Sequence, residues 1–487
     1  MNLLRRLAGT VLIAALLAGV IAIDRHEDAR PVGASSALVT LAGFPQTQEG
    51  SRISTSWFCP GAAAGDGLDG ASVVIANPSD VEITASVNYF SDLPAEVQNV
   101  SVEPRSRVEV ELLRGRTVGV VVPTVEIIGS VGTVEQELTY AAGDVTSQCV
   151  SQTSPTWYFA DGFTAEGSSQ RLVLTNPFPE SAVVNVAYTT LAGRRVPAPL
   201  QGIILAPRSA RSISLGDAGA QNEARIAVEV VATTGQIIAS RMQHYLGAGR
   251  LGYSTTVGVP SGLREWWFTS GRTGPLVSEQ LIVFNPSDRA AQVNVSFFGE
   301  GITNGLPVDQ ESSAASPSST VDIPAGEIVS INTDSIADLP KGDHGMVVAV
   351  LNNVSVVVEH VLSQSVGGSS FTAITNGVPS GLITETWRVP SGLAKGALNA
   401  LSILNTTAVD GTFTVAAIGP GGQVSLPALT DVPLTSAALA NLNVPEGVND
   451  AEIVITATVP VVVQRRTTRG HGLVGFGIVG ALPVKPR

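Results

Sequence analysis

The amino-acid sequence predicts an all-β protein of four tandem β-sandwich domains, because one pattern occurs four times and strand-length segments fill each copy. Each copy begins with a tryptophan, and Trp57, Trp157, Trp267 and Trp387 lie 100, 110 and 120 residues apart. Each tryptophan precedes an apolar run that ends in Asn-Pro, or in Asn405-Thr406 in the last copy. About seven short strands per ~100 residues is the count expected of an immunoglobulin-like sandwich. A closed, propeller-like array is the alternative, since repeated β units also form rings.

The composition fits a soluble β protein and disfavours nucleic acid as a partner. Charged residues make up 14% of the chain, against ~25% in typical domains, and 50 glycines and 29 prolines supply turns. The net charge of −13 leaves no basic patch that could neutralise phosphates. We expect no cofactor, and calcium is only a weak alternative for so acidic a chain.

The N-terminus carries an export signal. Arg5 and Arg6 precede an apolar run over residues 7–23, and basic residues of this kind stay on the cytoplasmic side. Val20-Ile21-Ala22 is a poor cleavage site, and the run is close to the ~20 residues that span a bilayer. Residues 1–30 are therefore predicted to be a signal-anchor helix, or else a cleaved signal peptide. The protein would be a single-pass cell-membrane protein with its C-terminal bulk outside the cytoplasm, or secreted if the signal is removed.

A tether over residues 31–50 leads into four predicted units, and each tryptophan is expected to be a buried anchor of its own unit. The second unit shows the pattern most clearly, because alternating or apolar runs are separated there by turn residues. The units are placed at residues 51–152, 153–262, 263–382 and 383–487. The strands of the second unit are predicted at residues 157–159, 171–175, 182–189, 202–205, 210–215, 224–232 and 236–245, followed by a last segment at 252–259.

The two cysteines are predicted to form a disulfide. Cys59 and Cys149 lie near the two ends of the first unit in a chain that carries an export signal. Two buried free thiols are the alternative. Neither cysteine has a cysteine or histidine nearby in the sequence that would suggest a metal site.

The sequence contains no recognisable catalytic or metal-binding motif. It has no Gly-x-Ser-x-Gly elbow, and its five histidines form no pair with metal-ligand spacing. The stretch Gly65-Asp66-Gly67-Leu68-Asp69-Gly70 offers two carboxylates in a glycine loop, but it lacks the spacing and final glutamate of an EF-hand, so a plain turn is favoured. We expect a protein without catalytic or metal-ligating residues.

A polar pair follows the late apolar strand of every unit. Long polar side chains repeated at one strand position could line a binding groove. The structural interpretation is favoured, because most side-chain hydrogen bonds go to the backbone or to water. The pairs are Glu135-Gln136, Ser240-Arg241, Glu359-His360 and Gln464-Arg465.

The order of these motifs resembles a repeat found in an uncharacterised, domain-of-unknown-function family of actinobacterial exported envelope proteins. In the fourth unit Gln464-Arg465 matches its last polar pair, whereas Glu135-Gln136 and Glu359-His360 depart from it. The resemblance covers roughly residues 50–480 and implies no established activity. The matching positions of the second unit are Trp157, Asn176, Pro177, Pro207, Ser209, Ser240 and Arg241.

Two functions compete on this basis, and an exported hydrolase is a third class that a deep cleft with a Ser-His-Asp set or with paired carboxylates in contact would revive. The first is a non-enzymatic, membrane-anchored scaffold or interaction protein of the cell envelope, whose partner is a protein or a cell-wall component. The second is an array of carbohydrate-binding modules that recognise cell-wall glycans. Only 5% of the residues are aromatic, and the tryptophans occupy repeat positions, so platforms for stacking on sugars are scarce. Buried tryptophans would favour the first function.

Overall fold

The computed structural model shows an all-β chain in which every pair of neighbouring strands is antiparallel. Gly43–Arg487 form one compact unit. The predicted signal or anchor helix and most of the tether lie outside the described residues, in which no helix is both long and apolar enough to span a bilayer. The structure describes residues 41, 43–47, 54–65, 67–91, 93–129, 131–141, 143–247, 249–299, 302, 317–366, 369–390, 397–419, 421–444, 451–469 and 474–484.

Units 1, 2 and 3 each consist of two sheets that pack face to face, and in unit 4 the long strand β34 (Glu452–Arg469) runs through both layers and joins them into one nine-stranded sheet. In unit 2 one sheet has the order β10-β16-β12-β13, with β14 against β12, and the other has the order β15-β11-β17-β18. Leucine, valine and isoleucine side chains from both sheets fill the space between them. The elements of unit 2 are β10 (Thr156–Phe159), η1 (Ala165–Gly167), β11 (Ser169–Asn176), β12 (Ala182–Thr190), β13 (Gly193–Arg195), η2 (Ala198–Leu200), β14 (Ile203–Leu205), β15 (Ser209–Ser214), β16 (Ile226–Thr234), β17 (Ile238–Tyr245) and β18 (Gly252–Val257).

The other units repeat this arrangement. Unit 1 contains β1 (Ser54–Phe58), β2 (Ala62–Ala63), β3 (Leu68–Asn77), β4 (Ile83–Phe90), β5 (Glu96–Val102), β6 (Ser106–Glu111), β7 (Val120–Ile128), β8 (Thr133–Tyr140) and β9 (Gly143–Gln148). Unit 3 contains β19 (Glu265–Thr273), β20 (Val277–Phe284), β21 (Ala291–Phe298), β22 (Ser318–Ile323), β23 (Ile328–Asn332), η3 (Thr333–Ser335), β24 (Gly342–Val350), β25 (Val357–Val366), β26 (Ser369–Asn376), β27 (Val378–Pro379) and η4 (Ser380–Leu382). Unit 4 contains β28 (Thr384–Val389), β29 (Ala397–Asn405), β30 (Gly411–Gly419), β31 (Gly422–Ser425), η5 (Pro427–Leu429), β32 (Val432–Leu434), β33 (Leu439–Asn443), β34 (Glu452–Arg469), β35 (Val474–Gly480) and β36 (Leu482–Pro483).

The strand order differs from that of an immunoglobulin domain. There the first strand joins the sheet of the second, and the last strand joins the other sheet. Here the first strand β10 pairs with β16, and the late strand β17 pairs with β11. The chain passes from one sheet directly into the other after β16, and in unit 4 the continuous strand β34 runs through both sheets. The prediction of sandwiches holds, whereas the immunoglobulin order does not.

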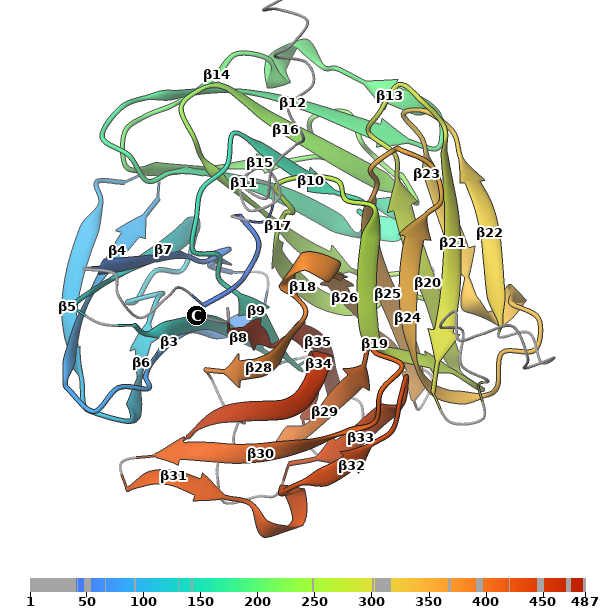
Figure 1. Cartoon of the computed structure of the whole chain (residues 1–487). Helices are drawn as coiled ribbons and strands as arrows, with labels where there is room; N and C mark the ends of the chain where they lie inside the picture. Colours follow the sequence, from blue (N-terminus) through green and yellow to red (C-terminus); the bar gives the residue numbers. More distant parts are fainter. Residues whose placement is uncertain are drawn as a thin grey trace, which may run out of the picture. The chain divides into compact units, whose positions relative to one another are not determined.

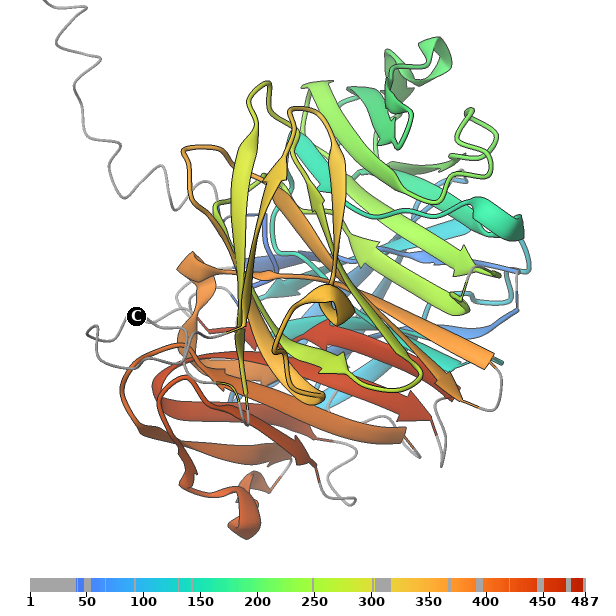
Figure 2. The same ribbon diagram turned by 90° about the vertical axis from the view of Figure 1, so that its right-hand side faces the viewer.

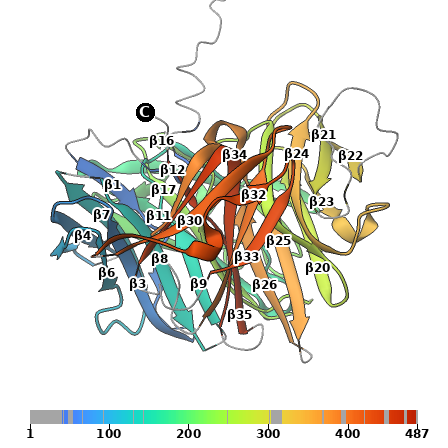
Figure 3. The same cartoon turned by 60° about the horizontal axis from the view of Figure 1, so that its bottom comes forward.

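The four units close into a ring around a central axis (Figures 1 and 3). The innermost strand of each unit faces this axis, and β9 contacts both β18 and β35, while β26 contacts the same two strands. Figure 2 shows the strands of unit 3, in yellow and orange, from the side. This closed arrangement corresponds to the ring that the sequence left as an alternative to a row of domains.

A buried tryptophan occupies the same place in every unit. Trp57, Trp157 and Trp387 are fully buried, and each indole Nε1 donates to a backbone carbonyl of its own unit. In unit 3 this position belongs to Trp266, which pairs with Val348 as Trp157 pairs with Val230.

The assignment of Trp267 to the repeat position is therefore wrong. Neighbouring residues of a strand point to opposite faces, so two adjacent tryptophans cannot share one role. Trp266 Nε1 donates to the carbonyl of Val356, whereas Trp267 Nε1 donates to the Glu265 carboxylate, and its ring stacks on Phe298. In the repeat pattern, Trp266-Trp267 and not Trp267-Phe268 corresponds to Trp157-Tyr158.

The conserved-looking asparagine of each repeat holds a turn together. In unit 2, Asn176 Nδ2 donates to the carbonyls of Glu180 and Ala206, and its Oδ1 accepts from the backbone N–H of Phe178. An asparagine side chain both donates and accepts, so it can satisfy several turn groups that would otherwise be unpaired. Asn405 makes the equivalent contacts although no proline follows it. Asn77 and Asn285 do the same in units 1 and 3.

Cys59 and Cys149 form the predicted disulfide. Both cysteines are fully buried in the core of unit 1, next to Trp57. The bond joins the end of the first strand to the end of the last strand, which fixes the two edges of this unit to each other.

Candidate functional site

The eight residues of the recurring polar pairs, here called the polar column, all lie in the interior of the ring. None of them is more than 1% exposed. They occupy β8, β17, β25 and β34 in equivalent register, since Gln136, Arg241, His360 and Arg465 lie opposite Val73, Leu172, Leu281 and Leu401. The column therefore contains buried polar groups that must find partners inside the protein.

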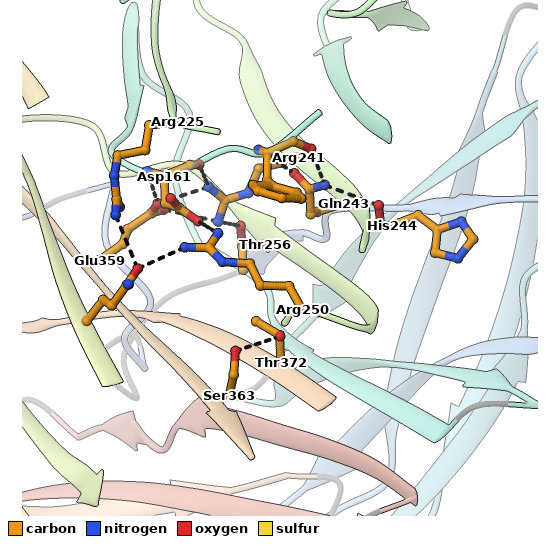
Figure 4. Close-up of polar contacts among 12 residues, drawn as sticks. Asp161, Arg225, Arg241, Gln243, His244, Arg250, Thr256, Glu359, Ser363 and Thr372 are labelled. Atoms are coloured by element: carbon orange, nitrogen blue, oxygen red, sulfur yellow. Dashed lines mark hydrogen bonds and ion pairs between the residues drawn. The ribbon is translucent and has the colours of Figure 1, made fainter. Parts of the chain in front are cut away.

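Between units 2 and 3 the column forms a buried ion pair (Figure 4). The Arg241 guanidinium contacts both carboxylate oxygens of Glu359, with Nη1 at 2.9 Å from Oε2 and Nη2 at 3.1 Å from Oε1. Glu359 also accepts from the backbone N–H of Asp161 at 2.6 Å. Burial acts to lower the pKa of Arg241, but the Glu359 carboxylate outweighs it and raises that pKa. Arg241 and Glu359 therefore form a bidentate salt bridge between units 2 and 3.

A second ion pair lies beside the first. Arg250 Nη1 contacts Asp161 Oδ2 at 2.9 Å, and Arg250 Nη2 donates to Gln280 of unit 3 (Figure 4). Arg225 also donates to Gln280, and burial lowers the pKa of Arg225. Asp161 follows β10 directly, so the end of the tryptophan strand and the polar column meet at this boundary.

The boundary between units 4 and 1 has the same design. Arg465 Nη2 lies 3.3 Å from Glu135 Oε2. Glu452 Oε2 accepts from Arg388 at 2.7 Å, and Glu452 Oε1 accepts from Thr133 of unit 1. Arg388, which replaces the aromatic residue of the other repeats, thus belongs to a polar network that reaches unit 1.

At the other two boundaries the column makes neutral contacts. Between units 1 and 2, Ser240 Oγ donates to the carbonyl of Pro60. Gln136 stays within unit 1, where it donates to and accepts from the backbone of the next residue, Gly61. Between units 3 and 4, Gln464 Oε1 accepts from the backbone N–H groups of Thr269 and Ser270. In all four cases the first residue of a pair reaches the unit before it around the ring.

Unit 3 contains a cluster that the sequence did not suggest. Glu279 lies 2.7 Å from His360 Nε2 and 2.8 Å from His344 Nε2, and all three side chains are at most 1% exposed. Burial acts to raise the pKa of Glu279, but the two histidines outweigh it and hold that pKa well below its usual range. Burial acts to lower the pKa of His344, and Glu279 outweighs it and raises that pKa. The partners are far apart in sequence, and no spacing motif connects them.

The remaining histidines and the glycine loop lie away from the polar column or outside the described residues. His244 stacks on Tyr253, while His26, His471 and Asp66 of the glycine loop lie outside the described residues. In the part of the chain that the structure describes, no three acidic, histidine or cysteine side chains are grouped to hold a metal ion.

Hollows between the units include one on the ring axis and one between units 1 and 2. An axial cavity of about 50 Å³ is bounded by the four innermost strands and by Pro45, and it has room for a few water molecules. A larger hollow of about 520 Å³ between units 1 and 2 is bounded by two arginines, hydroxyl groups and backbone, with no histidine, cysteine or carboxylate among the described residues that line it.

A family model described as "Family of unknown function (DUF5719)" matches residues 129–249 and 259–484. The chain belongs to the DUF5719 family. The matched segments of this DUF5719 protein contain the column residues of all four units, whereas Pro60 and Gly61, which Ser240 and Gln136 contact, precede them. The crystal structure of Thermotoga maritima 1070 aligns with 24% of this chain and 95% of that chain, at 17% identity and a TM-score of 0.20. None of the curated proteins compared with the chain matches it.

Proposed function

We propose that this DUF5719 protein is a non-enzymatic scaffold or interaction protein of the bacterial cell envelope. An N-terminal helix anchors it in the membrane, and the ring of four β-sandwich units stands outside the cytoplasm. The observation that carries this proposal is the burial of the polar column. The repeated polar groups that could have lined a substrate groove instead join one unit to the next.

The cysteines support the extracytoplasmic location. The disulfide between Cys59 and Cys149 is of the kind that persists in oxidising compartments. The basic residues and apolar run at the N-terminus are the corresponding export signal.

The tryptophans favour a protein partner over a glycan. Stacking on a sugar requires an aromatic ring at the surface, and all five tryptophans of the chain are at most 6% exposed. Apart from Phe178, the large exposed hydrophobic side chains of the described residues are aliphatic, including Val118 and Ile204 at 80% and 67% exposure. Such positions suit contact with another protein better than contact with a polysaccharide.

The location is tested by fractionating cells that produce the full-length protein and sequencing its N-terminus. We expect the protein in the membrane fraction with an uncleaved N-terminus and with its disulfide formed. Recovery in the cytosol would exclude an envelope function, and a mature N-terminus between Ala22 and Ser36 would show that the anchor is removed.

The scaffold role is tested with a photoreactive amino acid placed at Val118 or Ile204, and at buried Val184 as a matched control. A scaffold should give crosslinked protein adducts from the exposed positions but not from Val184. Crosslinks that vanish when the cell wall is digested with a muramidase would support the glycan alternative. Crosslinks of equal yield from all three positions would show that the adducts are not specific.

A further inference from the structure

The segment of residues 43–47, here called the strap, lies against three different units at one end of the ring axis. Four of its five residues are buried, and the partly exposed one is Pro45, which lines the axial cavity. Short segments that lead from a tether into a domain are usually poorly ordered unless something fixes them. The contacts of the strap are therefore a feature to explain.

The strap touches unit 2 through Gly43. A Cβ atom added at this glycine would lie 3.0 Å from the Cβ and Cγ atoms of Pro260 and 3.8 Å from the ring of Trp157. The backbone of the strap thus packs directly against the connector that closes unit 2, at a distance that leaves little room for a side chain.

The strap touches unit 3 through Phe44 and unit 4 through Thr47. Phe44 is 1% exposed, and its ring centre lies 5.8 Å from that of Trp266, the buried anchor of unit 3. Thr47 donates to the carbonyl of Pro483 from its backbone N–H at 3.0 Å and from its hydroxyl at 3.1 Å. One short segment therefore joins the closing connectors or anchors of three units.

We propose that the strap is a built-in clasp, which locks units 2, 3 and 4 around the axis and closes one end of the axial cavity. Elsewhere the described contacts join neighbouring units in pairs, through the polar column, through apolar side chains and through the innermost strands. If units 2, 3 and 4 moved apart, the contacts of the strap with Pro260, Trp266 and Pro483 would break. Removing its anchor should loosen the segments around Pro260, Trp266 and Pro483 together, although Pro483 lies more than 200 residues after the other two.

The proposal is tested on the full-length protein by hydrogen exchange followed by mass spectrometry. Phe44→Ala should raise exchange at least tenfold in the peptides that contain Pro260, Trp266 and Pro483, while β4 and β5 of unit 1 stay unchanged. The matched control is Phe178→Ala, the same change at a phenylalanine that is 38% exposed on unit 2, and it should leave all of these peptides unchanged.

Two outcomes would overturn the clasp. Faster exchange confined to the strap itself would show that the segment merely rests on the ring. Faster exchange of equal size in every peptide would show a general loss of stability.

Thr47→Val is a milder variant for the case in which Phe44→Ala does not fold. It removes the hydroxyl contact with Pro483 and keeps the buried volume, so about threefold faster exchange is expected near Pro483 and none near Pro260. No change near Pro483 would contradict a contact that holds unit 4.

Discussion

The boundary between units 2 and 3 and the boundary between units 1 and 2 use the same strand positions in different ways. At the first, Arg241 and Glu359 form a buried ion pair. At the second, the Ser240 hydroxyl of unit 2 donates to the backbone carbonyl of Pro60 in unit 1. Within the polar column the ring alternates between the two solutions, since the column contacts of units 4 and 1 are charged and those of units 3 and 4 are neutral. Outside the column, Asp343 and Arg466 form an ion pair between units 3 and 4.

This alternation explains why the repeats do not carry the same residues. Glu135 of unit 1 pairs with Arg465 of unit 4, and Glu359 of unit 3 pairs with Arg241 of unit 2. Each charge therefore has its partner in the neighbouring unit. A repeat that carried an arginine in every copy without the matching carboxylate would bury unpaired charge, which is costly. The departures of units 1 and 3 from the repeat pattern are thus complementary to units 2 and 4.

The largest effect is expected from reducing the disulfide of unit 1. This unit has a charged column contact with unit 4 and a neutral column contact with unit 2. Opening the bond between Cys59 and Cys149 should destabilise unit 1 by about 4–5 kcal/mol on the chain-entropy model, because the closed loop spans 90 residues. Urea unfolding with and without a reductant measures this effect. A Cys59→Ala, Cys149→Ala double variant should match the reduced protein, and it should not respond to the reductant.

Breaking the charged boundary is expected to come next. Glu359→Ala leaves Arg241 buried without its carboxylate, and such a change costs about 3–5 kcal/mol. Native-state hydrogen exchange of β17 and β25 measures the loss. A double variant, Arg241→Met with Glu359→Leu, should recover most of the lost stability, because no charge is then left unpaired. A double variant that is as unstable as Glu359→Ala would contradict this explanation.

The neutral boundary should respond less. Ser240→Ala removes one hydrogen bond, from Ser240 Oγ to the carbonyl of Pro60, and should cost about 1 kcal/mol in the same exchange experiment. Val173, Ala210, Phe90 and other apolar side chains that join units 1 and 2 stay in place. A loss as large as that of Glu359→Ala would remove the distinction between the two kinds of boundary.

The smallest effect is expected from a change of pH, through the cluster of Glu279, His344 and His360 in unit 3. The raised pKa of His344 stabilises the folded state below about pH 6.5, and this contribution is lost as the pH rises through the folded pKa. The lowered pKa of Glu279 adds stability that is lost only in acid. The urea midpoint should therefore fall between pH 6 and pH 9.

Neighbouring charges must be kept constant in that experiment. Asp343 lies beside His344 and contacts Arg272 of unit 3 as well as Arg466 of unit 4. Glu279→Gln leaves these three groups intact, so it should flatten the pH dependence if the cluster causes it. A midpoint that still falls with pH in Glu279→Gln would point to another group.

The features that depend on one repeat could be predicted from the sequence. The spacing of the tryptophans and Asn-Pro pairs predicted the number of units, and the predicted export signal together with the two cysteines predicted the disulfide. The position of the tryptophan failed in unit 3 alone, because Trp266 and Trp267 are adjacent and the choice between them depends on which face of the strand is buried.

The features that depend on two units could not be predicted in the same way. Arg241 and Glu359 are 118 residues apart, and nothing in either repeat shows that the two side chains meet. Glu279 and His360 are 81 residues apart, on neighbouring strands whose register fixes the contact. Each pair becomes visible once the units are known to form a ring, because every unit then has two neighbours.

The hydrogen bonds between Thr47 and Pro483 place the start and the end of the described ring next to each other, 436 residues apart in the sequence. The order in which the four units follow one another along the chain is therefore circular in space. Such a chain could be joined between these two residues and opened at Ser261, in the connector between units 2 and 3. It would keep every strand pairing, and only the positions of its N- and C-termini would change. Domains whose ends meet in this way tolerate such circular permutation.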